Sequence, residues 1–224
     1  MISPEQIAEN VVRVRARIAA ACDRAGRDPA DVTLIAVTKT HLAEAVAAAY
    51  AAGIRDFGEN RVQEAAEKIP AARALGVEAT WHLIGNLQRN KVAAALPLFD
   101  VIHSVDSLRL AEALNERSTA GARVLLEVNV SGEASKHGVS PEDAPDLAER
   151  IGHMRHIALL GLMTVAPIAA EPEDARPIFR RLRDLRDALG LRELSMGMTG
   201  DFEVAIEEGA TFVRVGRAIF GART

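Results

Sequence analysis

Cysteine, aromatic side chains and long hydrophobic runs are all scarce in this sequence. The one cysteine among the 224 residues, Cys22, has no partner for an internal disulfide. Aromatic residues make up 4%, too few to favour a stacking platform for single-stranded nucleic acid. No apolar run approaches the roughly 20 residues that a membrane-spanning helix requires. These absences, with an N-terminus that predicts a helix and not a signal peptide, predict a protein of the reducing cytoplasm.

A surplus of positive charge is missing as well. The net charge of −4 at pH 7 provides no basic field for nucleic acid or for an anionic membrane. No Cys and His cluster has metal-ligand spacing, no G-x-S-x-G motif appears, and no G-x-G-x-x-G motif follows a predicted strand. Metal-assisted hydrolysis, serine hydrolysis and dinucleotide binding therefore have no support, and we predict neither a nucleic-acid nor a membrane partner.

The sequence does contain an even alternation of strand and helix patterns. Ser3 and Gln6 form a capping box for an amphipathic helix that ends at Gly26 and carries Cys22 on its apolar stripe, which predicts a buried structural thiol. Strands are predicted at 33–37, 54–57, 80–84, 99–104, 123–130, 158–163, 193–196 and 211–215. Helices are predicted at 42–52, 62–75, 87–95, 108–117, 142–154 and 176–189, the fifth of them capped by Ser140 and Pro141 after a polar loop at 131–140.

This alternation predicts the fold class. Eight strands that alternate with helices are typical of an α/β protein with a parallel sheet closed into a barrel. No linker, low-complexity segment or composition shift marks a boundary between domains. We therefore expect a single (β/α)8 TIM-type barrel domain over residues 1–224, with the N-terminal helix as an addition to it.

The first predicted strand leads directly into a lysine. Residues 33–37 are mostly aliphatic and suit a strand that is buried on both faces, so Lys39 falls at its carboxyl end. In barrels of this kind the chemistry is built at that end of the strands. An amine partly desolvated by aliphatic neighbours would have its pKa lowered towards nucleophilic use. The alternative is a surface lysine that merely closes a strand.

Two glycine-containing loops follow the seventh and eighth strands. Residues 195–199 and 215–218 each combine glycine with a predicted helix start, and Ser195 and Thr199 add hydroxyl donors. Glycine lets backbone amides approach a ligand, and helix N-termini favour negative charge, so the pair predicts a phosphate site. Closure of the barrel would bring both loops beside Lys39. The alternative is that the glycines only end the strands.

Other polar residues lie at the same ends of strands. Arg214 alternates with two valines, which directs it into the barrel mouth unless it forms a structural ion pair. Asn60, His82 and Asn86 come from the second and third strand ends. His82 would either orient a ligand or satisfy a hydrogen bond in the core.

The amino-acid sequences of several segments resemble those of one family. The chain is similar to the pyridoxal 5'-phosphate homeostasis proteins, also called the YggS or PROSC family, whose barrel resembles the N-terminal domain of alanine racemase. The similar segments run almost end to end: 36–40 (AVTKT), 57–64 (FGENRVQE), 81–91 (WHLIGNLQRNK), 104–106 (SVD), 129–131 (NVS), 136–138 (KHG), 161–163 (GLM), 194–198 (LSMGM) with Asp201, and 213–221 (VRVGRAIFG). Thr38 and Thr199 replace the serines common in the family but keep a hydroxyl.

The resemblance implies a cofactor and a set of residues that bind it. Lys39 matches the lysine that forms an aldimine with pyridoxal 5'-phosphate, and Arg214 matches the arginine near its pyridine nitrogen. The matching phosphate positions are Ser195, Thr199, Gly216 and Arg217, the last two through backbone amides. Asn60 at the pocket rim and Met196 complete the expected cofactor-binding residues, and no catalytic residue is assigned.

The implied function is to hold, buffer and supply this cofactor to apo-enzymes, without established catalysis. An arginine at the ring nitrogen disfavours a pyridinium and so weakens the cofactor as an electron sink. The racemase pairs its lysine with a tyrosine of a second domain, whereas Tyr50, the single tyrosine here, falls in the helix after strand one. A racemase-like enzyme is the alternative, a Schiff-base aldolase without cofactor is a third hypothesis, and a monomer is expected.

Overall fold

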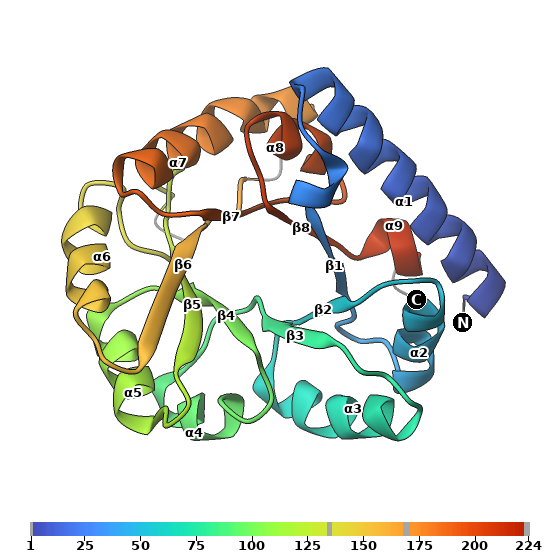
Figure 1. Cartoon of the computed structure of the whole chain (residues 1–224), viewed down its shortest axis with the longest axis horizontal. Coiled ribbons are helices and arrows are strands. Elements are labelled where there is room, and N and C mark those ends of the chain that lie inside the picture. The colour runs from blue at the N-terminus through green and yellow to red at the C-terminus, as the bar shows by residue number, and fades with distance from the viewer. Residues whose placement is uncertain (1, 134–135, 168–170, 222–224) are drawn as a thin grey trace.

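Eight parallel strands close into a barrel, and the helices surround it (Figure 1). The computed structural model describes residues 2–133, 136–167 and 171–221. The strands are β1 (Thr33–Val37), β2 (Asp56–Glu59), β3 (Thr80–Leu83), β4 (Val101–Val105), β5 (Ala122–Glu127), β6 (Ile157–Met163), β7 (Glu193–Met198) and β8 (Phe212–Val215). Each strand pairs with the next, and β8 pairs with β1, so the predicted (β/α)8 architecture is confirmed.

Helices follow the strands in the predicted alternation. They are α1 (Pro4–Ala25), α2 (Ala43–Ala51), α3 (Val62–Ala74), α4 (Val92–Ala95), α5 (Leu108–Arg117), α6 (Ala144–Gly152), α7 (Arg176–Ala188), α8 (Phe202–Glu207) and α9 (Arg217–Phe220). Short 3-10 helices lie at Pro29–Asp31, Arg89–Lys91 and Pro172–Ala175. The helix predicted at 87–95 is thus a 3-10 turn that leads into the single turn of α4.

Two predicted boundaries differ for local reasons. Ile54, predicted in the second strand, still donates its N–H to Ala49 of α2 at 3.0 Å, after Gly53 has turned the chain at φ 93°. This is a helix C-cap, so β2 begins only at Asp56. Ser140 accepts from the Asp143 N–H at 3.1 Å and therefore caps a turn that precedes α6. The predicted loop at 131–140 includes residues 134–135, which lie outside the described part of the chain.

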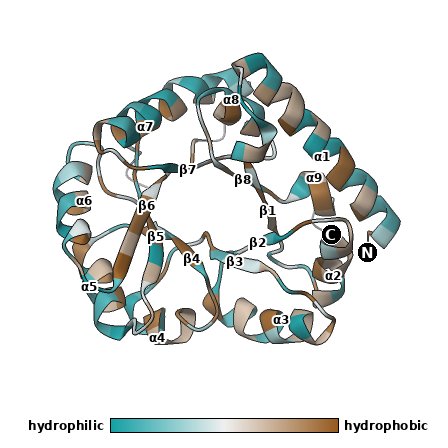
Figure 2. Ribbon diagram, in the orientation of Figure 1, coloured by the Kyte–Doolittle hydropathy of each residue, from teal (hydrophilic) through white to brown (hydrophobic). Residues whose placement is uncertain are grey.

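Two apolar layers hold the barrel together. The larger lies between the sheet and the helices and includes Ile7, Val11 and Cys22 of α1, so the thiol is buried as predicted. The smaller, a separate cluster of Val101, Leu125 and Met163 with the ring of Phe212, comes from residues on the inner side of the sheet. Figure 2 shows that the helices complement these apolar layers with polar residues, which are prominent on α1 and α7 at the outside of the ring.

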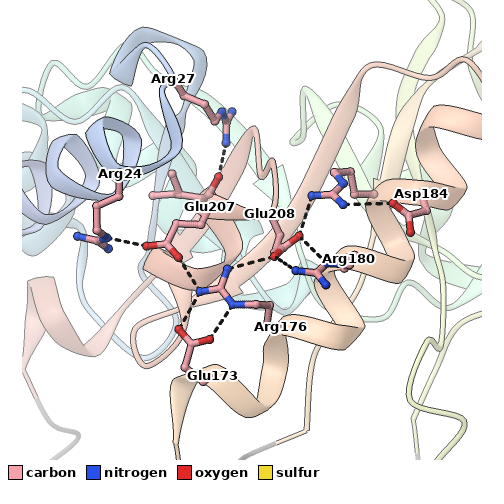
Figure 3. Close-up of polar contacts among 10 residues, drawn as sticks. Arg24, Arg27, Glu173, Arg176, Arg180, Asp184, Glu207 and Glu208 are labelled. Atoms are coloured by element: carbon pink, nitrogen blue, oxygen red, sulfur yellow. Dashed lines mark hydrogen bonds and ion pairs between the residues drawn. The ribbon is translucent and has the colours of Figure 1, made fainter.

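A network of ion pairs joins α1, α7 and α8 outside β7 and β8 (Figure 3). Glu208, whose side chain is 4% exposed, accepts hydrogen bonds from Arg176, Arg180 and Arg183 at 2.7 to 3.4 Å. Arg176 also pairs with Glu207, which pairs with Arg24 of α1. Burial would raise the pKa of Glu208, but the hydrogen bonds from Arg180 and Arg176 outweigh it and hold this pKa below its ordinary value.

Replacing Glu208 by glutamine should destabilise the fold by about 2 kcal/mol at neutral pH, because charged hydrogen bonds are lost while the arginines can still reach water. A carboxyl with a lowered pKa stabilises the folded state above its ordinary pKa of 4.5 and loses that contribution as pH falls through the folded pKa. The difference between wild type and Glu208→Gln in urea unfolding should therefore shrink below pH 4.5.

The matched control is Glu142→Gln, since Glu142 pairs with Arg181 on α7 at 2.7 Å but is 70% exposed. Such an exposed pair contributes about 0.5 kcal/mol or less. Equal losses in the two variants would contradict a structural role for the Glu208 network.

Candidate functional site

Lys39 lies in a tight turn at the carboxyl end of β1. The His41 N–H donates to the Thr38 carbonyl at 3.0 Å and closes the turn. Thr40 has φ 68°, a left-handed conformation that costs a residue with a side chain about 1 kcal/mol. Lys39 itself is half-buried. The turn that carries Lys39 is therefore held in a strained backbone conformation, and strain of this kind is often found at functional sites.

Helix α3 clamps both neighbours of Lys39. Lys68 donates to the Thr38 carbonyl and to Glu59 at 2.6 Å each, and to Glu64 at 2.7 Å. Glu64 accepts in turn from the Thr40 N–H at 2.6 Å. Since Glu64 and Lys68 are one helical turn apart, one face of α3 fixes the backbone before and after the lysine.

The clamp contains a buried charge pair that the sequence did not indicate. Lys68 is 7% exposed and Glu59 is fully buried. Glu59 also accepts from the Thr38 hydroxyl at 2.6 Å. Burial raises the pKa of the Glu59 carboxyl, and the attraction of the Lys68 ammonium opposes that shift. Glu59 ends β2 at the edge where Lys39 lies, so a charged residue at a predicted strand end was the available signal.

The loop after β8 lies beside this turn. Ala36 of β1 is paired with Val215 of β8, so Gly216 follows at the edge that bears Lys39. The His41 ring lies 4.9 Å from that of Phe220, which ties the lysine turn to α9. The structure thus brings the predicted phosphate loop at 215–218 next to the lysine turn. Arg217, the first residue of α9, is exposed.

The β7 loop needs its glycine. Gly197 has φ 88°, and a Cβ there would lie 2.5 Å from the Ala205 Cβ of α8. Asp201 accepts from the Met198 N–H at 2.5 Å and holds the turn that carries Thr199. Burial raises the pKa of Asp201, although its hydrogen bond from Met198 and the charge of Arg214 act the other way. Thr199 is half-buried in this turn, at the end of the strand where it was predicted to face a ligand.

Arg214 is 4% exposed and lies inside the barrel, as the alternation of β8 predicted. Its guanidinium donates to the Ser195 hydroxyl oxygen at 2.6 Å and to the Thr164 carbonyl at 2.8 Å. Burial lowers the pKa of Arg214 to about 10, and the negative charges of Asp201 and Glu127 oppose that shift. Both described contacts of Arg214 are hydrogen bonds to neutral groups, the Ser195 hydroxyl and the Thr164 carbonyl. The alternative, a direct ion pair, is not observed among these contacts.

Two predicted cofactor-binding side chains point elsewhere. Ser195 is fully buried, and its Oγ lies 2.8 Å from Nδ1 of His103 as well as 2.6 Å from Arg214. Met196 is fully buried in the layer between the sheet and the helices, because successive residues of a strand face opposite sides. The hydroxyl of Ser195 thus forms hydrogen bonds inside the barrel. Met196 can face the mouth only through its main chain.

Asn60 and Asn86 line one polar groove, whereas His82 does not face the mouth. The groove has a volume of about 510 Å³ and is lined by Asn60, Arg61, Val62, Gln63, Asn86, Gln88 and Lys91. His82 instead contacts His103 and Asp56 at 2.9 and 3.1 Å, which favours the interpretation as a core hydrogen bond.

Glu127 at the end of β5 was missed. This residue is 8% exposed, and burial, assisted by the nearby charge of Asp106, raises the pKa of its carboxyl to about 7, while His137 and Arg214 oppose the shift. A lone acidic residue after the aliphatic run at 124–126 was the signal. A group that titrates near neutral pH in a barrel mouth can donate or accept a proton.

In the part of the chain that the structure describes, neither a metal site nor a membrane span is found. No group of His, Cys, Asp and Glu among the described residues could hold a metal ion. Within the same ranges, every helix is too short or too polar to cross a bilayer.

Comparison with known proteins relates the whole chain to one family. Residues 2–224 match the family model described as alanine racemase, N-terminal domain. A pyridoxal phosphate homeostasis protein of Pseudomonas aeruginosa is 50% identical over 222 residues, 97% of this chain and 96% of that protein.

Two solved structures are similar over nearly their full length. An unknown protein from Bifidobacterium adolescentis is 44% identical with a TM-score of 0.92, covering 98% of both chains. PipY of Synechococcus elongatus, in a structure with pyridoxal phosphate bound, is 37% identical with a TM-score of 0.84, covering 96% of this chain and 100% of that one.

Replacing Lys68 by methionine should destabilise the fold by about 3 to 5 kcal/mol, because Glu59 would stay buried without its counter-charge. Urea unfolding measures this loss. In the double variant Lys68→Met/Glu59→Leu both charges are gone, so it should regain part of the stability. A double variant as unstable as the sum of the single ones would contradict direct coupling of the pair.

Proposed function

This chain belongs to the family of pyridoxal phosphate homeostasis proteins, and we propose that it binds pyridoxal 5'-phosphate and helps to control the supply of that cofactor. The observation that carries the proposal is the position of Lys39, in a clamped turn beside the β8 loop. PipY, which is similar over almost its whole length, has been solved with pyridoxal phosphate bound.

The residues at the barrel mouth fit this group. A phosphorylated aldehyde with an aromatic nitrogen needs an amine for its carbonyl carbon, donors for its phosphate and a partner for its ring. Lys39 offers the amine, and the Thr199 turn and the Gly216 loop offer donors. Arg214 is a cation that lies below the mouth on the strand next to β1, opposite Ile35.

Lys39 would attach the cofactor as a Schiff base, or aldimine. Its Nζ attacks the aldehyde carbon, a C=N bond forms, and the aldehyde oxygen leaves as water. The clamp from α3 supports this role, since the Thr38 carbonyl and the Thr40 N–H, on either side of Lys39, are both held.

We assign the phosphate to the loops after β7 and β8. Thr199 would donate its hydroxyl, and Gly216 and Arg217 their backbone amides at the start of α9. Asn60 would lie at the rim, within the groove that it lines together with Asn86. Ser195 would act through Arg214 and not on the phosphate, because its hydroxyl is engaged inside the barrel.

Storage and delivery suit this site better than catalysis. A guanidinium near the ring nitrogen disfavours a pyridinium and leaves the cofactor a weak electron sink. Tyr50 lies on α2 with its ring against Arg55, 4.2 Å from the guanidinium carbon, outside the sheet. It cannot serve as an acid or base across the barrel mouth. We therefore propose that the protein buffers the reactive aldehyde and releases it to apo-enzymes.

One observation favours a second candidate, a racemase-like enzyme. Glu127, with its pKa of about 7, lies at the barrel mouth and could exchange a proton with a bound amino acid. Such an enzyme would need this carboxyl, whereas a carrier would not.

The purified protein should be yellow with bound cofactor, and Lys39→Ala should lose the visible absorption. Lys39→Arg, which keeps the positive charge but forms no stable imine, should be equally colourless. Borohydride treatment of the wild type without added substrate should leave a pyridoxyl group on the peptide that contains Lys39, as mass spectrometry can show. Absence of that adduct would contradict the proposal and leave the cofactor-free aldolase hypothesis.

Mixing the loaded protein with an apo-enzyme should restore that enzyme's activity while the visible band of the carrier declines. Amino acids incubated with the loaded protein in deuterated water should show no α-proton exchange. Exchange that disappears in Glu127→Gln would instead favour the racemase-like enzyme.

A further inference from the structure

Five side chains form a continuous series of hydrogen bonds across the inside of the barrel. His82 Nε2 lies 3.1 Å from Asp56 Oδ1, and His82 Nδ1 lies 2.9 Å from His103 Nε2. His103 Nδ1 lies 2.8 Å from Ser195 Oγ, which accepts from Arg214 Nη1 at 2.6 Å. The five residues come from β2, β3, β4, β7 and β8, so the series links opposite sides of the sheet.

The series is closed to water except at one end. His103 and Ser195 are fully buried and His82 is 1% exposed, whereas the Asp56 side chain is 25% exposed. The Phe212 ring packs against both imidazoles, with centroids 5.8 Å from His82 and 5.5 Å from His103. Hydrogen bonds in such a low-dielectric interior polarise one another, and any group left unpaired there is costly.

The charges at the two ends favour one direction for every bond. The Asp56 carboxylate can only accept, so His82 must carry its proton on Nε2. His82 Nδ1 then accepts from Nε2–H of His103, and His103 Nδ1 accepts the hydroxyl proton of Ser195. Arg214 can only donate, and it donates to the remaining lone pair of Ser195. All contacts are satisfied with both imidazoles neutral.

The other proton arrangements fit less well. With His82 protonated on Nδ1 alone, its Nε2 lone pair would face the carboxylate of Asp56. With His82 doubly protonated, His103 would donate from Nδ1 to Ser195, whose oxygen would then accept twice. Burial, reinforced by His82 and Arg214, lowers the pKa of His103 well below its ordinary value, which keeps its ring neutral.

We propose that Asp56, His82, His103 and Ser195 form one positioning relay that fixes the guanidinium of Arg214 through a single set of histidine tautomers. Asp56 begins β2, whereas the lysine turn lies beyond the opposite, carboxyl end of β1. The relay therefore makes the orientation of the Arg214 guanidinium depend on the Asp56 carboxylate. Among the described contacts, Asp56 touches neither Arg214 nor Lys39. The effect of the relay on cofactor binding rests on the function proposed above, but its tautomers do not.

The direct test is nitrogen NMR of the protein labelled with ¹⁵N in its 6 histidines and free of cofactor. His82→Gln and His103→Gln identify the two buried rings. Both should be neutral at neutral pH and protonated on Nε2. A proton on Nδ1 of either ring, or an imidazolium at His82, would overturn the relay.

The second test breaks the anionic end while keeping its shape. In Asp56→Asn the amide can present either oxygen or NH₂ to His82, so the single tautomer should be lost. The dissociation constant for pyridoxal 5'-phosphate should rise about 10-fold, as on loss of an outer hydrogen-bond partner. Glu193→Gln is the matched control, because Glu193 starts β7 at the same end of the barrel outside the series, and it should change neither result.

The outcomes separate the two proposals. Unchanged tautomers and unchanged affinity in Asp56→Asn would overturn the positioning role even if the wild type binds the cofactor. Wild-type protein that binds no pyridoxal 5'-phosphate would overturn the proposed function, while the histidine spectra would still decide the relay.

Discussion

The pairing of β8 with β1 closes the barrel, and the candidate site depends on that closure. Ala36 lies opposite Val215, so the two chain segments leave the sheet side by side, one into the lysine turn and the other into the Gly216 loop. Lys39 and Gly216 are 177 residues apart in sequence, and this register brings their turns to one edge. Helix α1 supports the closure from outside, because Asn10 donates to the Ile219 carbonyl at 2.8 Å.

Charge is used in two different ways around this frame. On the outside, Glu208 is buried, but the arginines around it stay partly exposed and join the helices while they keep contact with water. At the mouth, Lys68 and Glu59 are buried, and their pair is arranged to hold the backbone on both sides of Lys39. The first arrangement serves stability, whereas the second determines where an amine is presented.

The sequence predicted the fold because its signals were local and repeated. Aliphatic runs such as 33–37 and the glycine or capping residues between them are sufficient to count eight βα units. The predicted boundaries were wrong where a residue expected in one element completes the hydrogen bonds of another. Ile54 was predicted in the second strand, but its N–H completes α2 before β2 begins. Lys39, Thr199 and Gly216 could be predicted as candidates because each follows the end of a strand, a position that a sequence pattern can reveal.

The interior of the barrel could not be predicted in the same way. His82, His103 and Ser195 meet only because three-dimensional register aligns β3, β4 and β7, and no spacing along the chain indicates such a contact. Ser195 illustrates the limit: its loop predicted a phosphate donor, but strand alternation turns its hydroxyl inward to Arg214. The family resemblance supplied a residue list, and the side-chain geometry divided that list into groups at the mouth and groups beneath it.

A crystal structure of the protein grown with pyridoxal 5'-phosphate tests the central claim most directly. The account predicts continuous electron density from Nζ of Lys39 to the cofactor, with the phosphate between the Thr199 turn and the Gly216 loop and the ring nitrogen towards Arg214. An unmodified Lys39, or a phosphate bound away from these two loops, would contradict it.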